Sequence, residues 1–133
     1  MFRKILVGTN GSTRSKRAIE TAVELALVSG AELHILGVLE PQLPSRSLAS
    51  SDDLDEARRV LGPVVDQALR HALARGVTST STEVRVGSAA QEIVDTAERG
   101  GFDLIVLGVH GNSLGSTTDR VTHHAHCSVH VVR

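Results

Sequence analysis

The chain has 133 residues, enough for one domain with its own hydrophobic core. Hydrophobic residues make up 41% and charged residues 22% of the sequence, a balance typical of folded globular domains and not of disordered or fibrous chains. The formal net charge of −1 offers no electrostatic basis for nucleic acid or an anionic membrane surface as the main partner. We therefore expect a single domain over residues 1–133 with no nucleic-acid or membrane partner.

Two features of the sequence bear on cellular location. The apolar run at residues 5–7 is too short for a signal peptide or a membrane span. Cys127 is the only cysteine and cannot form an internal disulfide, which agrees with a reducing compartment. We expect a cytoplasmic protein.

Aromatic side chains are almost absent, because Phe2 and Phe102 are the only two and the chain has no Trp or Tyr. A protein that binds single-stranded nucleic acid normally needs such rings as stacking platforms. Any bound base would instead be held by aliphatic side chains and backbone groups.

Apolar runs and helical periodicity alternate along the first half of the chain. Residues 5–7 are predicted as a buried strand that ends in a glycine loop at 8–11. Ser12 is the expected N-cap of a helix that Gly30 ends, and residues 33–39 form a second strand. A polar surface loop is expected over 42–52, followed by a helix to Gly76 with a kink or break at Pro63.

The second half continues this alternation. It contains predicted strands at 78–86, 104–107 and 128–132, and predicted helices at 89–99 and 116–125, the last capped by Ser116. Five strands and four helices in alternation predict the α/β class, with a parallel sheet covered on both faces. Ligands of such sheets lie beyond the carboxyl ends of the strands where the winding direction reverses. The loops after the first and fourth strands would meet there if those strands are neighbours.

The stretch 104–117 carries the strongest functional signal. An apolar strand runs into spaced glycines and then into a Ser-Thr pair that opens a helix: Gly108, Gly111, Gly115, Ser116 and Thr117. Such a loop presents free backbone N–H groups and the positive end of a helix dipole to a phosphate. His110 could donate to the same phosphate, or could simply be an exposed loop residue. Spaced glycines by themselves also suit tight turns without a ligand.

The two ends of the chain resemble universal stress protein domains. Residues 4–12, KILVGTNGS, are similar to the start of these domains, and residues 115–132, GSTTDRVTHHAHCSVHVV, to their end. The order of predicted elements and the chain length match as well. The resemblance implies a doubly wound, five-stranded parallel sheet of order 3-2-1-4-5 with four helices, an adenine nucleotide alpha-hydrolase-like fold.

The resemblance also implies a function. Members of this family are stress-response proteins, and many bind ATP; here AMP, ADP or cyclic AMP are alternatives, and Mg²⁺ is an optional companion of the phosphates. The implied contact residues are Gly8, Thr9, Asn10, Val38, Leu107, Gly108, His110, Gly111, Gly115, Ser116 and Thr117. Homodimers joined through the last strand, Ser128–Val132, and a protein partner of unknown identity are implied too.

The chain departs from the family pattern in two places. Asn10 stands where the family usually has Asp, so the side chain still accepts a hydrogen bond from an adenine amino group but lacks the charge. The ATP-binding pattern is G-x2-G-x9-G-[ST], whereas three residues separate Gly111 from Gly115 here. Four residue steps reach at most roughly 14 Å, so the loop could cradle one phosphate but could not wrap a triphosphate. The alternatives are a smaller or differently placed nucleotide, or a dimeric interaction module that binds none.

Catalysis and metal binding are weaker interpretations. The chain lacks the G-x-x-x-x-G-K-[ST] motif and its only lysines are Lys4 and Lys16, so a weak ATPase is the third hypothesis and no catalytic residue is predicted. Histidines and a cysteine between residues 123 and 130 are suitable zinc or nickel ligands. They cross from a helix into a strand, where side-chain directions diverge, so no metal site is predicted.

Overall fold

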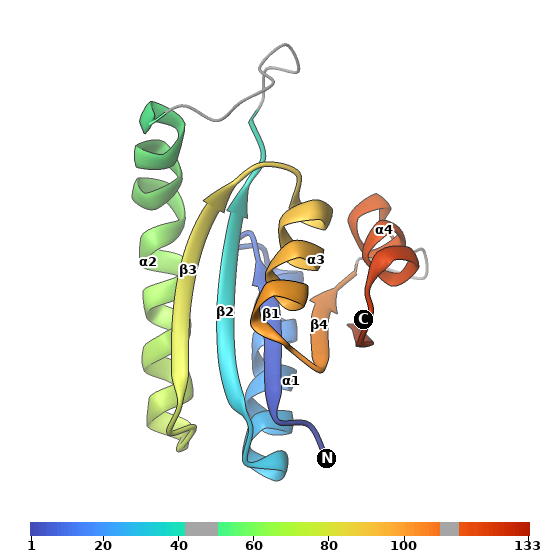
Figure 1. The fold of residues 1–133 in the computed structure, drawn as a ribbon. Helices are drawn as coiled ribbons and strands as arrows, with labels where there is room; N and C mark the ends of the chain where they lie inside the picture. Colours follow the sequence, from blue (N-terminus) through green and yellow to red (C-terminus); the bar gives the residue numbers. More distant parts are fainter. Residues whose placement is uncertain (42–50, 110–114) are drawn as a thin grey trace.

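The computed structural model describes residues 1–41, 51–109 and 115–133. Within these segments five strands alternate with four helices (Figure 1): β1 (Lys4–Thr9), α1 (Thr13–Ser29), β2 (Glu32–Leu39), α2 (Ser51–Arg75), β3 (Thr80–Val86), α3 (Ala89–Gly100), β4 (Leu104–Gly108), α4 (Ser116–His124) and β5 (Ser128–Val132). All strand pairs are parallel, in the order β3-β2-β1-β4-β5. The predicted α/β class and strand order are confirmed. Most of the expected surface loop at 42–52 lies outside the described residues.

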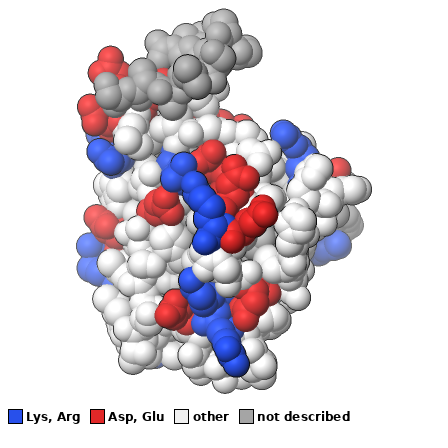
Figure 2. All heavy atoms as spheres, in the orientation of Figure 1, with Lys and Arg blue, Asp and Glu red and all other residues white. Residues whose placement is uncertain are grey.

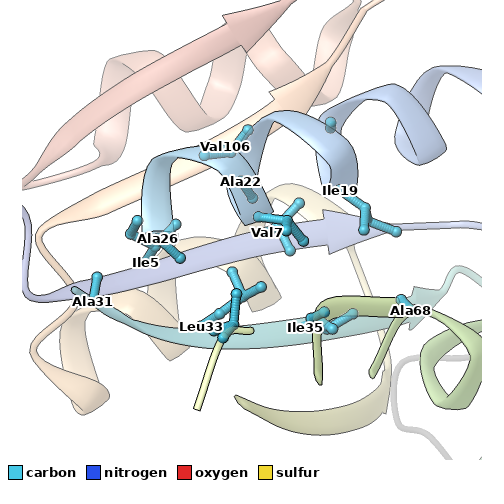
Figure 3. Packing of buried hydrophobic residues seen from close by; sticks show 14 of the residues in the cluster. Ile5, Val7, Ile19, Ala22, Ala26, Ala31, Leu33, Ile35, Ala68 and Val106 are labelled. Atoms are coloured by element: carbon cyan, nitrogen blue, oxygen red, sulfur yellow. The ribbon is translucent and has the colours of Figure 1, made fainter. Parts of the chain in front are cut away.

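The sheet is covered on both faces, and Figure 1 shows α3 and α4 in front of it with α1 behind. Successive residues of β1 point to opposite faces, so Ile5 and Val7 pack in the layer with α1 and α2, whereas Leu6 packs with α3 and α4. Figure 3 shows the first layer, in which Ile19 and Ala22 of α1 lie over β1. Because the central strands bury both sides, they appear in the sequence as continuous apolar runs.

Helix α1 begins and ends where the sequence predicts. The Ser12 side chain accepts a hydrogen bond from the backbone N–H of Ser15 at 3.3 Å, which satisfies one donor of the first turn. Gly30 ends the helix with a φ of 67°, a left-handed conformation that glycine adopts without steric cost. The first strand, its loop and the start of α1 are therefore held in place by local interactions.

Of the kink or break expected at Pro63, the break is wrong, because α2 runs as one element from Ser51 to Arg75. Pro63 is exposed, whereas Leu61 and Val65 on the neighbouring positions are buried. The carbonyl that loses its hydrogen bond to proline therefore lies on the water side of the helix. Burial of the opposite side keeps the two halves together.

No helix in the described segments is both long and apolar enough to cross a bilayer.

Candidate functional site

A pocket of about 420 Å³ opens at the carboxyl ends of β1 and β4. The chain winds from β1 to β2 and β3 on one side, and then from β4 to β5 on the other, so the winding direction reverses between these two strands. The pocket thus occupies the position at which doubly wound sheets hold their ligands. Helices α1 and α4 both begin beside it.

Every predicted contact residue within the described segments lines this pocket: Gly8, Thr9, Asn10, Val38, Leu107, Gly108, Gly115, Ser116 and Thr117. His110 and Gly111 lie outside the described residues. Sequence reasoning missed further lining residues: Ser12, Arg14, Ser15, Ala89, Ile93, Val109 and Thr118. Arg14 and Ser15 could have been predicted from the sequence, because they form the first turn of the helix after a glycine loop. Ala89 and Ile93 were not, because only the packing of α3 brings them to the pocket.

The loop between β1 and α1 is held by its own side chains. The Thr9 hydroxyl donates to Ser15 Oγ at 3.0 Å and accepts the N–H of Gly11 at 3.1 Å. Asn10 Oδ1 accepts the N–H of Ser12 at 3.0 Å, and the Ser15 hydroxyl lies 3.3 Å from the same oxygen. Thr9 and Ser15 are buried, so the bond between their hydroxyls is shielded from water. The Asn10 side-chain carbonyl therefore shapes the loop.

Two glycines allow the elements around the pocket to approach one another closely. A Cβ on Gly108 would overlap the backbone carbonyl of Arg14, so β4 can end against the first turn of α1 only without a side chain at this position. A Cβ on Gly8 would lie 3.1 Å from Ile93 Cδ1, tighter than an ordinary contact. These glycines have a structural role whether or not a ligand binds.

Gly115 differs from both, and it corrects the expected cap of α4. Gly115 is the N-cap, with φ −70° and ψ 166°, whereas Ser116 is the first helical residue and makes no capping bond. A Cβ on Gly115 would meet no atom of the described residues within 4 Å, so neither its backbone conformation nor the described packing requires glycine here. Because no side chain of the described residues caps the helix, the N–H groups of its first turn are open to an anion at the pocket as far as those residues go.

The electrostatic character of the pocket is positive. Arg14 is the only charged residue among its described lining residues, and it has no ion-pair partner in the described part of the chain. Val38, Ile93 and Leu107 supply an apolar wall. The arrangement offers a cation and helix N–H groups to an anion, and aliphatic side chains to a flat apolar group.

The histidines near the C-terminus do not gather into a metal site in the described segments. His123 Nδ1 lies 2.9 Å from the backbone oxygen of Asp119 and 3.6 Å from its carboxylate. No group of three or more His, Cys, Asp or Glu residues in residues 1–41, 51–109 and 115–133 could hold a metal ion.

The fold and the pocket define a doubly wound α/β domain with its site at the switch point. The chain belongs to the universal stress protein family, whose model matches residues 1–133. It is 33% identical to universal stress protein YxiE of Bacillus subtilis, with 100% of both chains covered. It is 30% identical to universal stress protein MJ0531 of Methanocaldococcus jannaschii, with 100% of this chain and 83% of that one covered. The resemblance of the sequence to this family is confirmed.

Solved structures of the family have the same fold. A universal stress protein in complex with cAMP is 28% identical, with a TM-score of 0.79 and with 99% of this chain and 97% of that chain covered. A member from Burkholderia pseudomallei is 27% identical, with a TM-score of 0.80 and with 97% and 94% covered.

Proposed function

We propose that this chain is a stress-response protein that binds an adenine nucleotide in the pocket at the carboxyl ends of β1 and β4. The observation that carries the proposal is the convergence of Arg14 and the uncapped N-terminus of α4 on one cavity. Both are suited to a phosphate, one by its charge and the other by its N–H groups. The related structure that contains cAMP supports an adenine nucleotide as the ligand.

The lining residues fit the parts of a nucleotide differently. The phosphate would lie at Gly115, Ser116 and Arg14, and the base would lie against Val38 and the other aliphatic side chains, with Asn10 Nδ2 as a donor. No Asp or Glu is among the described lining residues. Mg²⁺ normally needs one or two carboxylate ligands in addition to phosphate oxygens, and the described lining residues supply none.

A shorter loop favours ligands with fewer phosphates than ATP. Only three residues separate Gly111 from Gly115. The alignment with YxiE spans 149 positions, whereas this chain has 133 residues. This chain therefore lacks residues that its relative has, either at this loop or elsewhere. We therefore rank AMP and cyclic AMP ahead of ATP and ADP. The second candidate function, a dimeric interaction module without a nucleotide, follows from the same shortening.

The nucleotide would act by changing which conformation a partner protein meets. A homodimer in the cytoplasm, joined through the open edge of β5, is the form in which we expect the protein to work. Turnover of ATP is the least favoured activity, because the described pocket contains no carboxylate or histidine to activate water.

The absence of Trp and Tyr makes nucleotide binding easy to detect. The purified protein absorbs little between 260 and 280 nm, so a co-purified nucleotide would dominate that spectrum. We expect such absorbance, or a thermal shift with ATP, ADP, AMP or cyclic AMP, and we expect Gly115→Val to abolish it without loss of folding. A flat spectrum together with no shift for any of the four nucleotides would rule out the proposal and leave the interaction module.

Phosphate release, measured for the same pair of proteins, tests turnover. A rate that Gly115→Val removes would assign ATPase activity to this pocket. A rate that the substitution leaves unchanged would come from a contaminant.

A further inference from the structure

A second group of reactive side chains lies on β2 and β3, away from the nucleotide pocket. These strands run side by side (Figure 1), and their register places His34 directly opposite Ser81. His34 Nδ1 lies 2.6 Å from Ser81 Oγ, and His34 Nε2 lies 3.0 Å from Glu83 Oε1. A serine, a histidine and a carboxylate are thus joined by two hydrogen bonds through the two nitrogens of one ring.

The protonation of this group follows from Glu83. Burial alone would raise the pKa of Glu83, but hydrogen bonds from His34 and Arg85 outweigh it and hold the pKa below its usual value. Arg85 donates to Glu83 Oε2 at 3.0 Å, so the carboxylate is charged and only accepts. In the neutral imidazole the proton then lies on Nε2, which leaves Nδ1 as an acceptor. In that form the Ser81 hydroxyl supplies the proton of the 2.6 Å bond.

Ser81 is the most exposed member of the group and His34 the least exposed. Ser81 is exposed, whereas the His34 side chain is 15% exposed and that of Glu83 32%. The His34 ring also lies 5.6 Å from the ring of Phe102. The hydroxyl can therefore meet a reagent in solution while its base is sheltered and oriented.

We propose that Ser81 is a nucleophilic serine that accepts acyl groups from activated esters, with His34 as general base and Glu83 as the residue that positions the imidazole. The roles are those of a serine-hydrolase triad with the two ring nitrogens exchanged. In the reaction, Ser81 Oγ forms a bond to the carbonyl carbon, and the bond from that carbon to the leaving oxygen breaks. The hydroxyl proton passes to His34 Nδ1 and then to the leaving oxygen. Water then attacks the acyl-serine, and His34 Nδ1 takes a proton from the water and passes it to Ser81 Oγ. The bond from Oγ to the acyl carbon breaks and the acid is released.

The edge of the sheet supplies a donor for the carbonyl oxygen. The N–H of Leu33 donates to Ser79 O, and the N–H of Gly87 donates to Leu39 O. These two bonds determine which residues of β2 and β3 direct their N–H groups toward the other strand. By this pattern the N–H groups of alternate residues, Ser81 among them, face β2. The N–H of Thr82 then faces away from β2, at the outer edge of the sheet, where no strand in the described segments pairs with β3. It follows the nucleophile directly, as an oxyanion donor often does.

The surroundings define the kind of substrate. Figure 2 shows acidic and basic side chains together on this face of the molecule, in the view in which β2 and β3 lie in front of α1. The titratable and charged groups around His34 are Glu83 and Arg85 of β3, Glu92 of α3 bound to Arg85, and Lys4 of β1, which lies over Phe102. Ser81 is exposed and lies outside the pocket at the carboxyl ends of β1 and β4, so the proposal calls for no long acyl chain. Small acyl groups on good leaving groups are the expected class.

Two probes test the proposal on the intact chain: a fluorophosphonate, and 4-nitrophenyl acetate. We expect one label per chain, found on Ser81 in the tryptic peptide 76–85, and a burst of one nitrophenolate per chain. Ser79 is the matched control, because it is exposed in the same peptide and no histidine is bonded to it. Absence of the label, or equal labelling of Ser79 and Ser81, would overturn the proposal.

Variants separate chemistry from folding. Ser81→Ala should remove the label, and His34→Gln should slow it by about 100-fold or more while the melting temperature shows that the protein is folded. Glu83→Gln should slow labelling, because the His34 ring loses the charged acceptor that positions it, and Glu83→Asp should restore part of the rate. Labelling that is independent of His34 in a folded variant would show an ordinary surface serine. The Gly115→Val variant should be labelled on Ser81 at the normal rate, so the labelling result is independent of the proposed nucleotide site.

Discussion

The Cα atom of Gly108, at the end of β4, lies against the backbone carbonyl of Arg14 in the first turn of α1. This contact joins the two halves of the sheet at the point where the winding reverses, and it brings the loops after β1 and β4 to one pocket. Arg14 itself lines that pocket. The same contact thus supports the fold and determines the position of the positively charged Arg14 in the site.

Gly108→Ala should destabilise the protein, because the added methyl group overlaps backbone that cannot rotate away. The cost expected for such overpacking is about 1–3 kcal/mol in the free energy of unfolding, measured by urea denaturation. Gly115→Ala is the matched control and should cost less than Gly108→Ala, because no atom of the described residues lies within 4 Å of its Cβ and only the N-cap preference for glycine is lost. Equal effects of the two substitutions would show that β4 and α1 do not meet as described.

Arg14→Gln should weaken nucleotide binding about 10-fold or more, since a charge-assisted hydrogen bond contributes roughly 1.5–3 kcal/mol. Isothermal titration with AMP and with cyclic AMP measures the change. Arg17→Gln is the control, because Arg17 is exposed on the same helix and does not line the pocket. A similar loss in both variants would indicate a general effect of net charge, and no loss in either would remove Arg14 from the site.

Val131→Pro should separate the two protomers if they pair through β5. The N–H of Val109 donates to Val132 O, and by this phase the N–H of Val131 faces the open edge of the sheet. Proline therefore removes a donor needed by a partner strand and spares the bonds to β4. Light scattering should show a monomer for this variant and a dimer for Val131→Thr, which keeps the N–H. A dimeric Val131→Pro would place the interface elsewhere.

Glu83→Gln should reduce the dependence of stability on acid. The pKa of Glu83 is lowered in the folded protein, so its charged form contributes stability above the usual value of 4.5. That contribution is lost as the pH falls through the lowered pKa. Melting temperatures recorded from pH 6 down to pH 3 should therefore fall less steeply for Glu83→Gln than for the parent. Parallel curves would mean that the bonds from His34 and Arg85 do not persist in solution.

Local interactions determined most of what the sequence predicts. The apolar runs of β1 and β4, the Ser12 cap and the Gly30 end of α1 each depend on residues within a turn or a strand of one another. The glycine loops after β1 and β4 could be assigned to one site because parallel strands end at one edge of a sheet. The family resemblance supplied the strand order that makes β1 and β4 neighbours.

Tertiary structure decided the rest, since it depends on which distant residues meet. Burial of Leu61 and Val65 keeps α2 whole through Pro63, and the start of α4 makes Gly115 the cap in place of Ser116. The wall formed by Ile93 requires α3 to pack over β1. His34 and Ser81 stand 47 residues apart, and only the register of β2 on β3 places them within a hydrogen bond. Sequence periodicity specifies which side of an element is buried, but register and packing select its neighbours.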